Sequence, residues 1–274
     1  MRKSKRNRWI YSVLMLLCVV GFWWFENFYT PDPYASENPA VKTEFPDDFL
    51  PDYPEAEVVV HNHHVLGYSE PYEQAAWVAY TLKPTHLTRD DRQRPYFVED
   101  PRVGTKSADW RNYRGSGYDR GHLCPAGDRR FSEEAYNQTF YTSNISPQDS
   151  EFNAGTWNTL EQQVRAWCRR YGELYVITGG VLEPGLEEIG SEDVDVPRYF
   201  YKVVFRGKAA NLKATAFLMP NREENLPLDN YRVSIDVIEA ATGIDFFAEL
   251  DTRTQQQWEA EATTSSWPIT LRGN

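Results

Sequence analysis

The sequence predicts an α+β fold: a mainly antiparallel central sheet with flanking helices, preceded by one hydrophobic helix at the N-terminus. Segments with strand and helix patterns follow one another irregularly, which favours an antiparallel sheet over repeated βαβ units. No glycine-rich phosphate loop follows a strand pattern, so a doubly wound nucleotide-binding fold finds no support. The chain has 274 residues, 41% of them hydrophobic, and can therefore bury a sizeable core.

The N-terminus has the pattern of a membrane segment. Residues 1–8 carry five Lys and Arg side chains and precede an apolar run at residues 9–25. This length is at the short end of what crosses a bilayer core of about 30 Å. The run predicts a single transmembrane anchor, with a signal peptide as the alternative. Because positive charges stay in the cytoplasm, we expect the rest of the chain to be periplasmic or extracellular, either anchored or secreted.

Three further regions follow this segment. Residues 26–57 are rich in Pro, Asp and Glu and show little periodicity, which predicts a solvated stalk. The globular domain is expected over residues 58–252, and a C-terminal tail over residues 253–274.

Short apolar runs predict the strands of the sheet. The first two candidates are residues 58–60 and 75–80, and a loop rich in arginine spans residues 84–114. A β-rich composition also marks residues 139–145. Three core strands are expected further on, at Leu174–Val181, Tyr199–Phe205 and Leu212–Met219.

Two helices are predicted from periodicity and end signals. The longer helix opens at Asn153 and ends at Gly172. Apolar side chains recur along it at 3-4-3-4 spacing, which makes one buried stripe: Trp157, Leu160, Val164, Trp167 and Tyr171. A short helix is expected over Ser234–Ala241, with Ser234 as its cap.

The charge distribution allows a basic cleft on an acidic body. The net charge of −11 argues against a general nucleic-acid coat, because a uniformly acidic surface repels phosphate. Between Lys83 and Arg130, however, eleven Lys and Arg residues stand against seven Asp and Glu residues. Cys124 and Cys168 give no disulfide framework and are expected to be unpaired.

The segment Tyr118-Asp119-Arg120-Gly121-His122 is the strongest candidate for chemistry. An imidazole can take a proton from water at neutral pH, so His122 is a candidate general base. A turn histidine beside a surface ion pair is the alternative. Downstream, Asn153 and Glu161 can supply the few oxygen ligands that Mg²⁺ needs, one directly and one through bound water. For Asn153 alone, a helix cap is the alternative.

These segments together resemble a known signature. Tyr118–Pro125, Thr139–Gln148 and Phe152–Arg165 are similar to the motif of the DNA/RNA non-specific endonucleases of the ββα-metal superfamily, a family that includes endonuclease G. The resemblance covers residues 58–250, the whole globular part. It implies a ββα-metal motif, a Mg²⁺ cofactor with Mn²⁺ as an alternative, and hydrolysis of DNA or RNA to 5′-phosphate ends. No small organic cofactor is expected.

The resemblance also implies roles for individual residues. His122 would be the general base, Asn153 the direct metal ligand and Glu161 a carboxylate that holds metal-bound water. Asn144 would orient the base, and Arg120 and Arg165 would contact the substrate phosphate. Apart from the resemblance, Asp119 and Gly121 are expected to be structural, since Asp119 can fix the turn and Gly121 allows an unusual backbone angle. Trp110, in a basic loop, is a candidate for contact with substrate. The family uses one further arginine upstream, for which Arg94 is preferred and Arg92 and Arg89 are the alternatives.

Other readings of the sequence remain open at this stage. The partners expected are the phosphate backbone of DNA or RNA, a membrane through the N-terminal helix, and a second copy of the chain in a homodimer. A nucleic-acid-binding module without catalysis and a phosphodiesterase for small substrates are the rival functions. His61 and His63 would lie on one face of a strand, which invites a second metal site, but a structural or substrate-rim role is favoured because no cysteine lies close by and no acidic partner is evident.

Overall fold

The computed structural model describes residues 2–29, 43–207, 212–250, 255 and 266–270. The chain divides into two compact units, Met1–Asp32 and Pro33–Asn274. The predicted stalk and C-terminal tail lie partly outside the described residues.

The first unit contains one long helix, α1, at Arg2–Phe28. It has no proline to interrupt it. Apolar side chains from Trp9 to Phe25 are exposed along it. The segment Asn7–Glu26 is long and apolar enough to cross a membrane by length and composition, a test that a signal sequence near the N-terminus also passes. The predicted apolar helix is therefore present.

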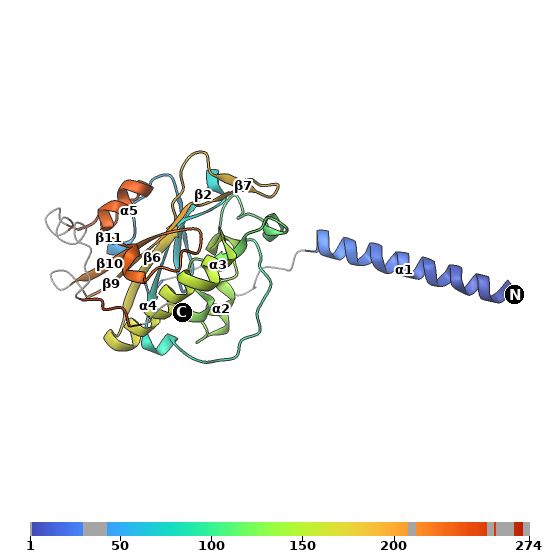
Figure 1. Ribbon diagram of the computed structural model, residues 1–274, viewed down its shortest axis with the longest axis horizontal. Coiled ribbons are helices and arrows are strands. Elements are labelled where there is room, and N and C mark those ends of the chain that lie inside the picture. The colour runs from blue at the N-terminus through green and yellow to red at the C-terminus, as the bar shows by residue number, and fades with distance from the viewer. Residues whose placement is uncertain (1, 30–42, 208–211, 251–254, 256–265, 271–274) are drawn as a thin grey trace. The chain divides into compact units, whose positions relative to one another are not determined.

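The second unit is built on an antiparallel sheet of seven strands, in the order β1-β2-β3-β6-β9-β10-β11 (Figure 1). The strands are β1 Glu57–Val60, β2 Val65–Ser69, β3 Gln74–Leu82, β6 Leu174–Gly180, β9 Tyr199–Arg206, β10 Lys213–Pro220 and β11 Arg232–Val233. Two hairpins stand apart from it, β4 Asp119–His122 with β5 Ile145–Gln148, and β7 Glu187–Ile189 with β8 Val194–Val196. The predicted α+β class with a mainly antiparallel sheet is confirmed.

Helices cover both faces of the large sheet. The helices of this unit are α2 Glu133–Gln138, α3 Ser150–Phe152, α4 Asn158–Tyr171 and α5 Ile235–Thr242, of which α4 and α5 pack on opposite faces of the sheet. Side chains alternate between two cores along the central strands, so that Val203 belongs to one core and Val204 to the other. The predicted stripe of α4 enters the core that contains Val204, while α5 contributes to the opposite core. The sheet thus separates two layers, and α4 is fixed by its buried stripe.

Several predicted boundaries are wrong. Strand β2 was not foreseen, and the β-rich segment 139–145 forms a short 3-10 turn, Thr142–Asn144, before β5 begins at Ile145. The helix predicted to open at Asn153 begins earlier, at Ser150, with Asp149 as its cap. Asn153 is therefore not the N-terminal cap of this helix; it follows α3 as its C-cap.

Both ends of the domain extend further than predicted. Phe45 and Phe49 are buried among Tyr175 and Phe205, so residues 45–57 belong to the packed domain and not to a stalk. On the C-terminal side, the buried Trp267 packs edge-on against Trp167 of α4 at 5.1 Å between ring centroids. The described part of the tail is thus part of the core.

Candidate active site

The segment around His122 is a strand, not a turn. β4 pairs antiparallel with β5, so that Asp119 lies opposite Gln148 and His122 opposite Ile145. A Cβ atom at Gly121 would lie 2.2 Å from the side-chain amide of Gln148, which only glycine allows. The structural role predicted for Gly121 thus has a steric reason. Helix α3 follows β5 directly, which completes a ββα unit.

Asn153 sits at an irregular turn of the helix. Residues Asn153–Trp157 form a π-helical turn between α3 and α4, and such turns are frequent at functional sites. The backbone of Gly155 is non-helical there. Glu223 accepts hydrogen bonds from the Thr156 amide at 2.7 Å and from the Thr156 hydroxyl. The carboxylate thereby satisfies a backbone group that the irregular turn exposes.

Asp119 orients the side chain of Asn153. Its carboxylate accepts hydrogen bonds from Asn153 Nδ2 at 3.0 Å and from the Ser150 hydroxyl at 2.8 Å. The side-chain nitrogen of Asn153 is thus held by Asp119 of β4. Asn153 Oδ1 accepts no hydrogen bond from the described residues. A fixed amide oxygen without a donor fits a hard divalent cation. The structural role of Asp119 stays a prediction, which these two hydrogen bonds support.

His122 lies against an aromatic floor. Its ring is 4.9 Å from Phe140 and 5.7 Å from Phe97, measured between centroids. The Nε2 atom is buried and has no hydrogen-bond partner among the described residues. Burial, and then the charge of Arg94, lowers the pKa of His122 to about 3. The imidazole is therefore neutral at neutral pH, the form that can accept a proton.

Arg94 and Arg120 share that floor with His122. The guanidinium of Arg94 lies 5.4 Å from the Phe97 ring and 5.7 Å from the Phe140 ring. Arg120 lies 4.9 Å from Phe97, and burial followed by the charge of Arg94 lowers its pKa. Two cations thus stand beside the neutral imidazole, an arrangement that favours a bound anion.

The two alternatives to Arg94 lie elsewhere in the contact network. Arg92 donates to the carbonyl of Arg130 at 3.0 Å and pairs with Asp90 at 3.3 Å. Among the described residues, no interaction joins Arg89 to His122. Of the three arginines, the structure brings Arg94 to the candidate base.

Trp110 acts as a platform for cations. The guanidinium groups of Arg111, Arg114 and Arg120 lie 5.0 to 5.5 Å from its ring. The contact with substrate that the sequence suggested for Trp110 stays a prediction. The structure adds a more specific role, because the ring helps to place Arg120.

Asn144 acts on the backbone that follows the candidate base. It is fully buried, and its side chain accepts from the Cys124 amide at 2.8 Å and donates to the Cys124 and Thr139 carbonyls. No described hydrogen bond joins Asn144 to the His122 ring. Its predicted orienting role would therefore be indirect, through the chain after β4.

Glu161 lies in a buried charge cluster on α4. Arg165 donates to Glu161 at 3.1 Å and to Asp128 at 2.5 Å, and both carboxylates raise the pKa of Arg165. Burial raises the pKa of Glu161, although Arg165 opposes that shift. A Cβ atom at Gly127 would lie 2.9 Å from Arg165. The phosphate contact predicted for Arg165 stays a prediction, since this guanidinium is held by two carboxylates.

The sequence does not predict two further buried polar side chains, Lys202 beside this cluster and Gln148 in the β4–β5 hairpin. Lys202 of β9 is fully buried, donates to the Thr178 hydroxyl at 3.2 Å and lies 4.4 Å from the Trp157 ring. Burial lowers its pKa to about 8, while Glu161 and Asp128 oppose the shift. Both amide atoms of Gln148 are buried without a partner among the described residues. A lysine in an apolar strand and a glutamine in a hairpin give no sequence signal that their side chains are buried near the candidate site.

The histidines near the start of the domain form no metal site. His61 Nε2 and the Asp100 carboxylate lie 2.8 Å apart in a buried network with Ser143. His61 and His63 follow β1 in a turn, so they do not share a strand face. Within the described ranges, no group of three His, Cys, Asp or Glu side chains could hold a metal ion. Cys124 and Cys168 are unpaired, as predicted, and both are buried.

Comparisons with known proteins define the class. The model of the DNA/RNA non-specific endonuclease family matches residues 50–253. Human mitochondrial endonuclease G is 36% identical over 206 residues, which cover 70% of this chain and 69% of that protein. Nuclease C1 of Cunninghamella echinulata var. echinulata is 35% identical, covering 70% and 82%. The chain therefore belongs to the DNA/RNA non-specific endonuclease family, and the predicted enzyme class is confirmed at the level of the family.

A solved structure extends this result to the fold. A crystal structure of an EndoG/EndoGI complex, which describes a mechanism of EndoG inhibition, superposes with a TM-score of 0.65 at 31% identity. The match covers 72% of this chain and 88% of that one. The chain spans only 62% of the zebrafish nuclease EXOG, to which it is 34% identical over 71% of its own length.

The predicted location is wrong. We expected a domain outside the cytoplasm, either anchored or secreted. The relatives instead include proteins named as mitochondrial, among them human endonuclease G and nuclease 1 of Schizosaccharomyces pombe. A basic flank before an apolar run predicts which side of a membrane the chain lies on. This pattern alone does not identify which membrane or compartment is involved.

Proposed function

We propose that this protein is a metal-dependent endonuclease that hydrolyses DNA and RNA without sequence preference. The observation that carries the proposal is one ββα unit that presents a neutral His122 at the end of β4 and an oriented amide oxygen of Asn153 in the following helix. Two arginines stand beside the histidine. This is the set of groups that phosphodiester hydrolysis needs.

In this mechanism His122 is the general base. Its neutral imidazole takes a proton from water as the water attacks phosphorus. The aromatic floor holds the ring in place, and Asn144 fixes the backbone beyond it. Arg94 and Arg120 bind the phosphate oxygens and stabilise the negative charge that grows in the transition state. As the oxygen of the water bonds to phosphorus, the bond from phosphorus to the 3′ oxygen breaks and the 3′ oxygen leaves with a proton from solvent, so that the products carry 5′-phosphate and 3′-hydroxyl ends.

Asn153 and Glu161 would hold the metal ion. Asn153 supplies Oδ1 directly, and Glu161 binds a water of the ion. Mg²⁺ is the proposed ion, with Mn²⁺ as the alternative; when bound, it would neutralise charge on the phosphate. Burial raises the pKa of Glu161, and the charges of Arg165 and Lys202 oppose that rise. Arg165 also holds the carboxylate in place.

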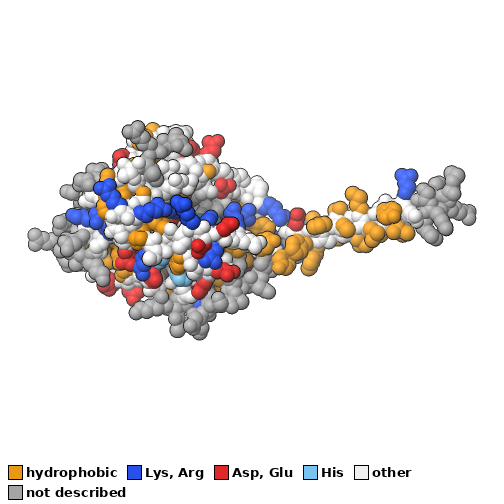
Figure 2. All heavy atoms as spheres, turned by 90° about the horizontal axis from the view of Figure 1, so that it is seen from below, with side chains coloured by type: hydrophobic (Ala, Val, Ile, Leu, Met, Phe, Trp, Pro, Cys, Tyr) orange, Lys and Arg blue, Asp and Glu red, His pale blue; other side chains and the backbone are white. Residues whose placement is uncertain are grey.

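Weak sequence preference follows from the chemistry of the site. The arginines and the metal ion would contact phosphate oxygens, and none of these contacts distinguishes one base from another. Figure 2 shows Lys and Arg side chains gathered in a band across one face of the domain. Such a band supports binding through the backbone, which depends strongly on salt.

Metal removal tests the proposed function. We expect purified protein to nick supercoiled plasmid and degrade RNA in Mg²⁺, to stop when a chelator is added, and to recover when Mg²⁺ is restored. Ligation of the cut ends without prior phosphorylation would verify 5′-phosphate products. Binding of plasmid without any cleavage in Mg²⁺ or Mn²⁺ would contradict the proposal and favour a binding module without catalysis.

Two proposals concern partners. The exposed apolar side chains of α1 support contact with a lipid bilayer, without assigning a compartment. Full-length protein should float with liposomes, whereas protein lacking residues 9–25 should remain at the bottom of the gradient.

A homodimer is the second proposal, and light scattering coupled to gel filtration tests it. A dimer mass at micromolar concentration is expected, and a monomer mass would rule the homodimer out.

A further inference from the structure

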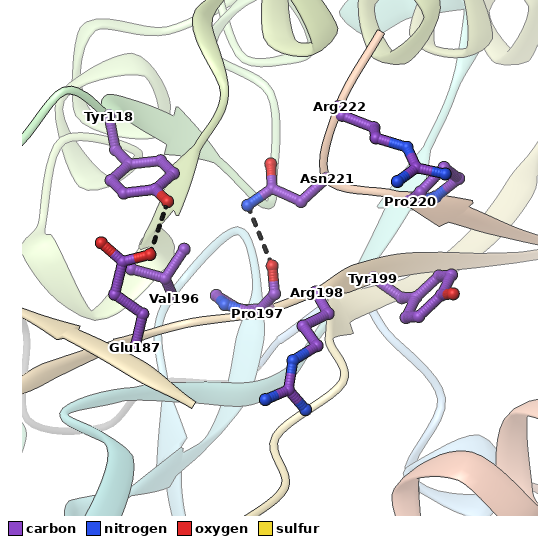
Figure 3. A pocket seen from close by; sticks show the side chains of 9 residues that line it. All are labelled: Tyr118, Glu187, Val196, Pro197, Arg198, Tyr199, Pro220, Asn221 and Arg222. Carbon is purple, nitrogen blue, oxygen red and sulfur yellow. Dashed lines mark hydrogen bonds between the residues drawn. The ribbon is translucent and has the colours of Figure 1, made fainter. Parts of the chain in front are cut away.

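A pocket lies beside the ββα unit. It has a volume of about 490 Å³, within the range of about 300–1,000 Å³ that is typical of small-ligand sites. Figure 3 shows its lining: Tyr118, Glu187, Val196, Pro197, Arg198, Tyr199, Pro220, Asn221 and Arg222. None of these residues takes part in the mechanism above.

Asn221 joins this pocket to helix α3, which precedes the candidate metal ligand Asn153. Its Oδ1 accepts from the Asp149 amide at 2.8 Å, and its Nδ2 donates to the carbonyls of Pro147 and Pro197 at 3.1 and 2.9 Å. Asp149 caps helix α3, four residues before Asn153, which is about 6 Å along a helix. Tyr118, next in sequence to Asp119, also lines the pocket. The pocket lining is therefore joined to the ββα unit that carries the candidate active site.

The side chains of the pocket suit a nucleotide. The ring of Tyr199 is accessible, with 44% of the residue exposed. Two arginines are also open to solvent: the side chains of Arg198 and Arg222 are 56% and 74% exposed. An accessible aromatic ring can stack on an unpaired base, and a guanidinium can bind its phosphate.

The acidic neighbours do not block this use. Arg198 pairs with Glu183 at 2.6 Å, and Arg222 pairs with Glu224 at 2.8 Å. Both pairs are on the surface, where solvent screening makes such pairs weak, so a phosphate can exchange with the carboxylate. The acidic residue of the lining, Glu187, is held by the Tyr118 hydroxyl at 3.0 Å, and can accept a hydrogen bond from a base amino group.

We propose that this pocket is an accessory subsite for one unpaired nucleotide of the substrate strand, on the flank of the cleaved phosphate. Tyr199 stacks on the base, and Arg222 and Arg198 bind the adjoining phosphate. The proposal rests on the proposed function, because it assigns the pocket to the same substrate. Through Asn221, the subsite contacts the cap residue of α3, about one helical turn before Asn153.

Binding in a chelator tests the subsite without cleavage. Fluorescence anisotropy would follow a labelled twelve-nucleotide single strand, as DNA and as RNA, on the full-length protein. Because stacking on one aromatic residue is worth about 1–3 kcal/mol, Tyr199→Ala should weaken binding by at least about fivefold. Arg222→Gln should weaken it about two- to fivefold and reduce the salt slope by about 0.7. A blunt duplex should be less affected by Tyr199→Ala.

Arg169→Gln provides the matched control. Arg169 is exposed on α4, sixteen residues after Asn153 and so about 24 Å further along the helix, and its loss should change binding less than 1.5-fold. Wild-type affinity in both pocket variants, or an equal loss in the control, would overturn the subsite. Since no cleavage is measured, this result is independent of the plasmid assay that tests the proposed function.

Discussion

Replacing His122 with alanine is expected to lower kcat/KM for DNA and RNA by about 10²- to 10⁴-fold, the contribution of a general base. The neutral ring would no longer take the proton of the attacking water. The fold should survive, because no described residue bonds the ring Nε2 and its neighbours are aromatic. Initial rates on plasmid and on RNA, with circular dichroism as a check of the fold, measure this effect.

His63→Ala is the matched control for that variant. His63 is partly buried against Phe131, with 5.4 Å between ring centroids, and belongs to no part of the proposed mechanism. It should keep wild-type kcat/KM. Equal rates for wild type and His122→Ala would remove His122 as the base.

The same residue has a consequence for pH. An imidazole with its ordinary pKa near 6.5 would be largely protonated at pH 5.5, whereas burial and Arg94 hold the pKa of His122 at about 3. The acid limb of kcat/KM should therefore lie well below pH 6.5. An acid limb centred near pH 6.5 that is caused by His122 would contradict the described burial of the ring.

The sign for stability follows from the same shift. The folded pKa is below the unfolded value, so the unfolded chain binds the proton first. His122 should therefore destabilise the fold progressively as pH falls from about 6.5 towards 3. Urea unfolding of wild type and His122→Ala at pH 7 and pH 5 would reveal this as a smaller loss in the variant.

Asn153→Ala is the second change with a large expected effect. It removes the amide oxygen that Asp119 orients. Loss of a supporting group around a metal already costs about 10- to 100-fold in affinity or activity, so loss of the ligand itself should cost more than about 100-fold. Magnesium titration of plasmid cleavage would show this as a rise in the half-saturating Mg²⁺ concentration together with a lower maximal rate.

A second asparagine makes the comparison specific. Asn137→Ala changes a partly buried asparagine of α2 that the proposed site does not use, and it should titrate like wild type. Asp119→Ala should fall between the two, because the Asn153 amide then loses one hydrogen bond and can rotate. An unchanged magnesium titration in Asn153→Ala would exclude this residue as the ligand.

Local pattern was enough for much of the fold. The stripe of α4 was readable because 3-4-3-4 spacing is a property of the chain itself, and its side chains enter the core as expected. Strand β2 was missed because it is short and contains Gly67, whose absent Cβ makes room for Trp77. The π-helical turn at Asn153 was missed because it depends on Glu223, seventy residues away in sequence.

The candidate site likewise combines features that the sequence predicts with contacts that it does not. The order of His122, Asn144, Asn153 and Glu161 was visible as a motif, yet what surrounds each of them was not. The link from Arg165 to Asp128 joins residues that no periodicity connects. Lys202 belongs to an apolar strand whose sequence gives no reason to bury a cation there. Such contacts are set by tertiary packing, which a single sequence does not record.

The central claim is that one ββα unit, with His122 as base and Asn153 as metal ligand, hydrolyses the phosphodiester backbone. Cleavage of one supercoiled plasmid by wild type, His122→Ala and Asn153→Ala, each with Mg²⁺ and with chelator, tests it most directly. The account requires rapid nicking by wild type in Mg²⁺ alone, and nicking at least about 100-fold slower in both variants. Cleavage by either variant at the wild-type rate, or wild-type cleavage that persists in chelator, would contradict it.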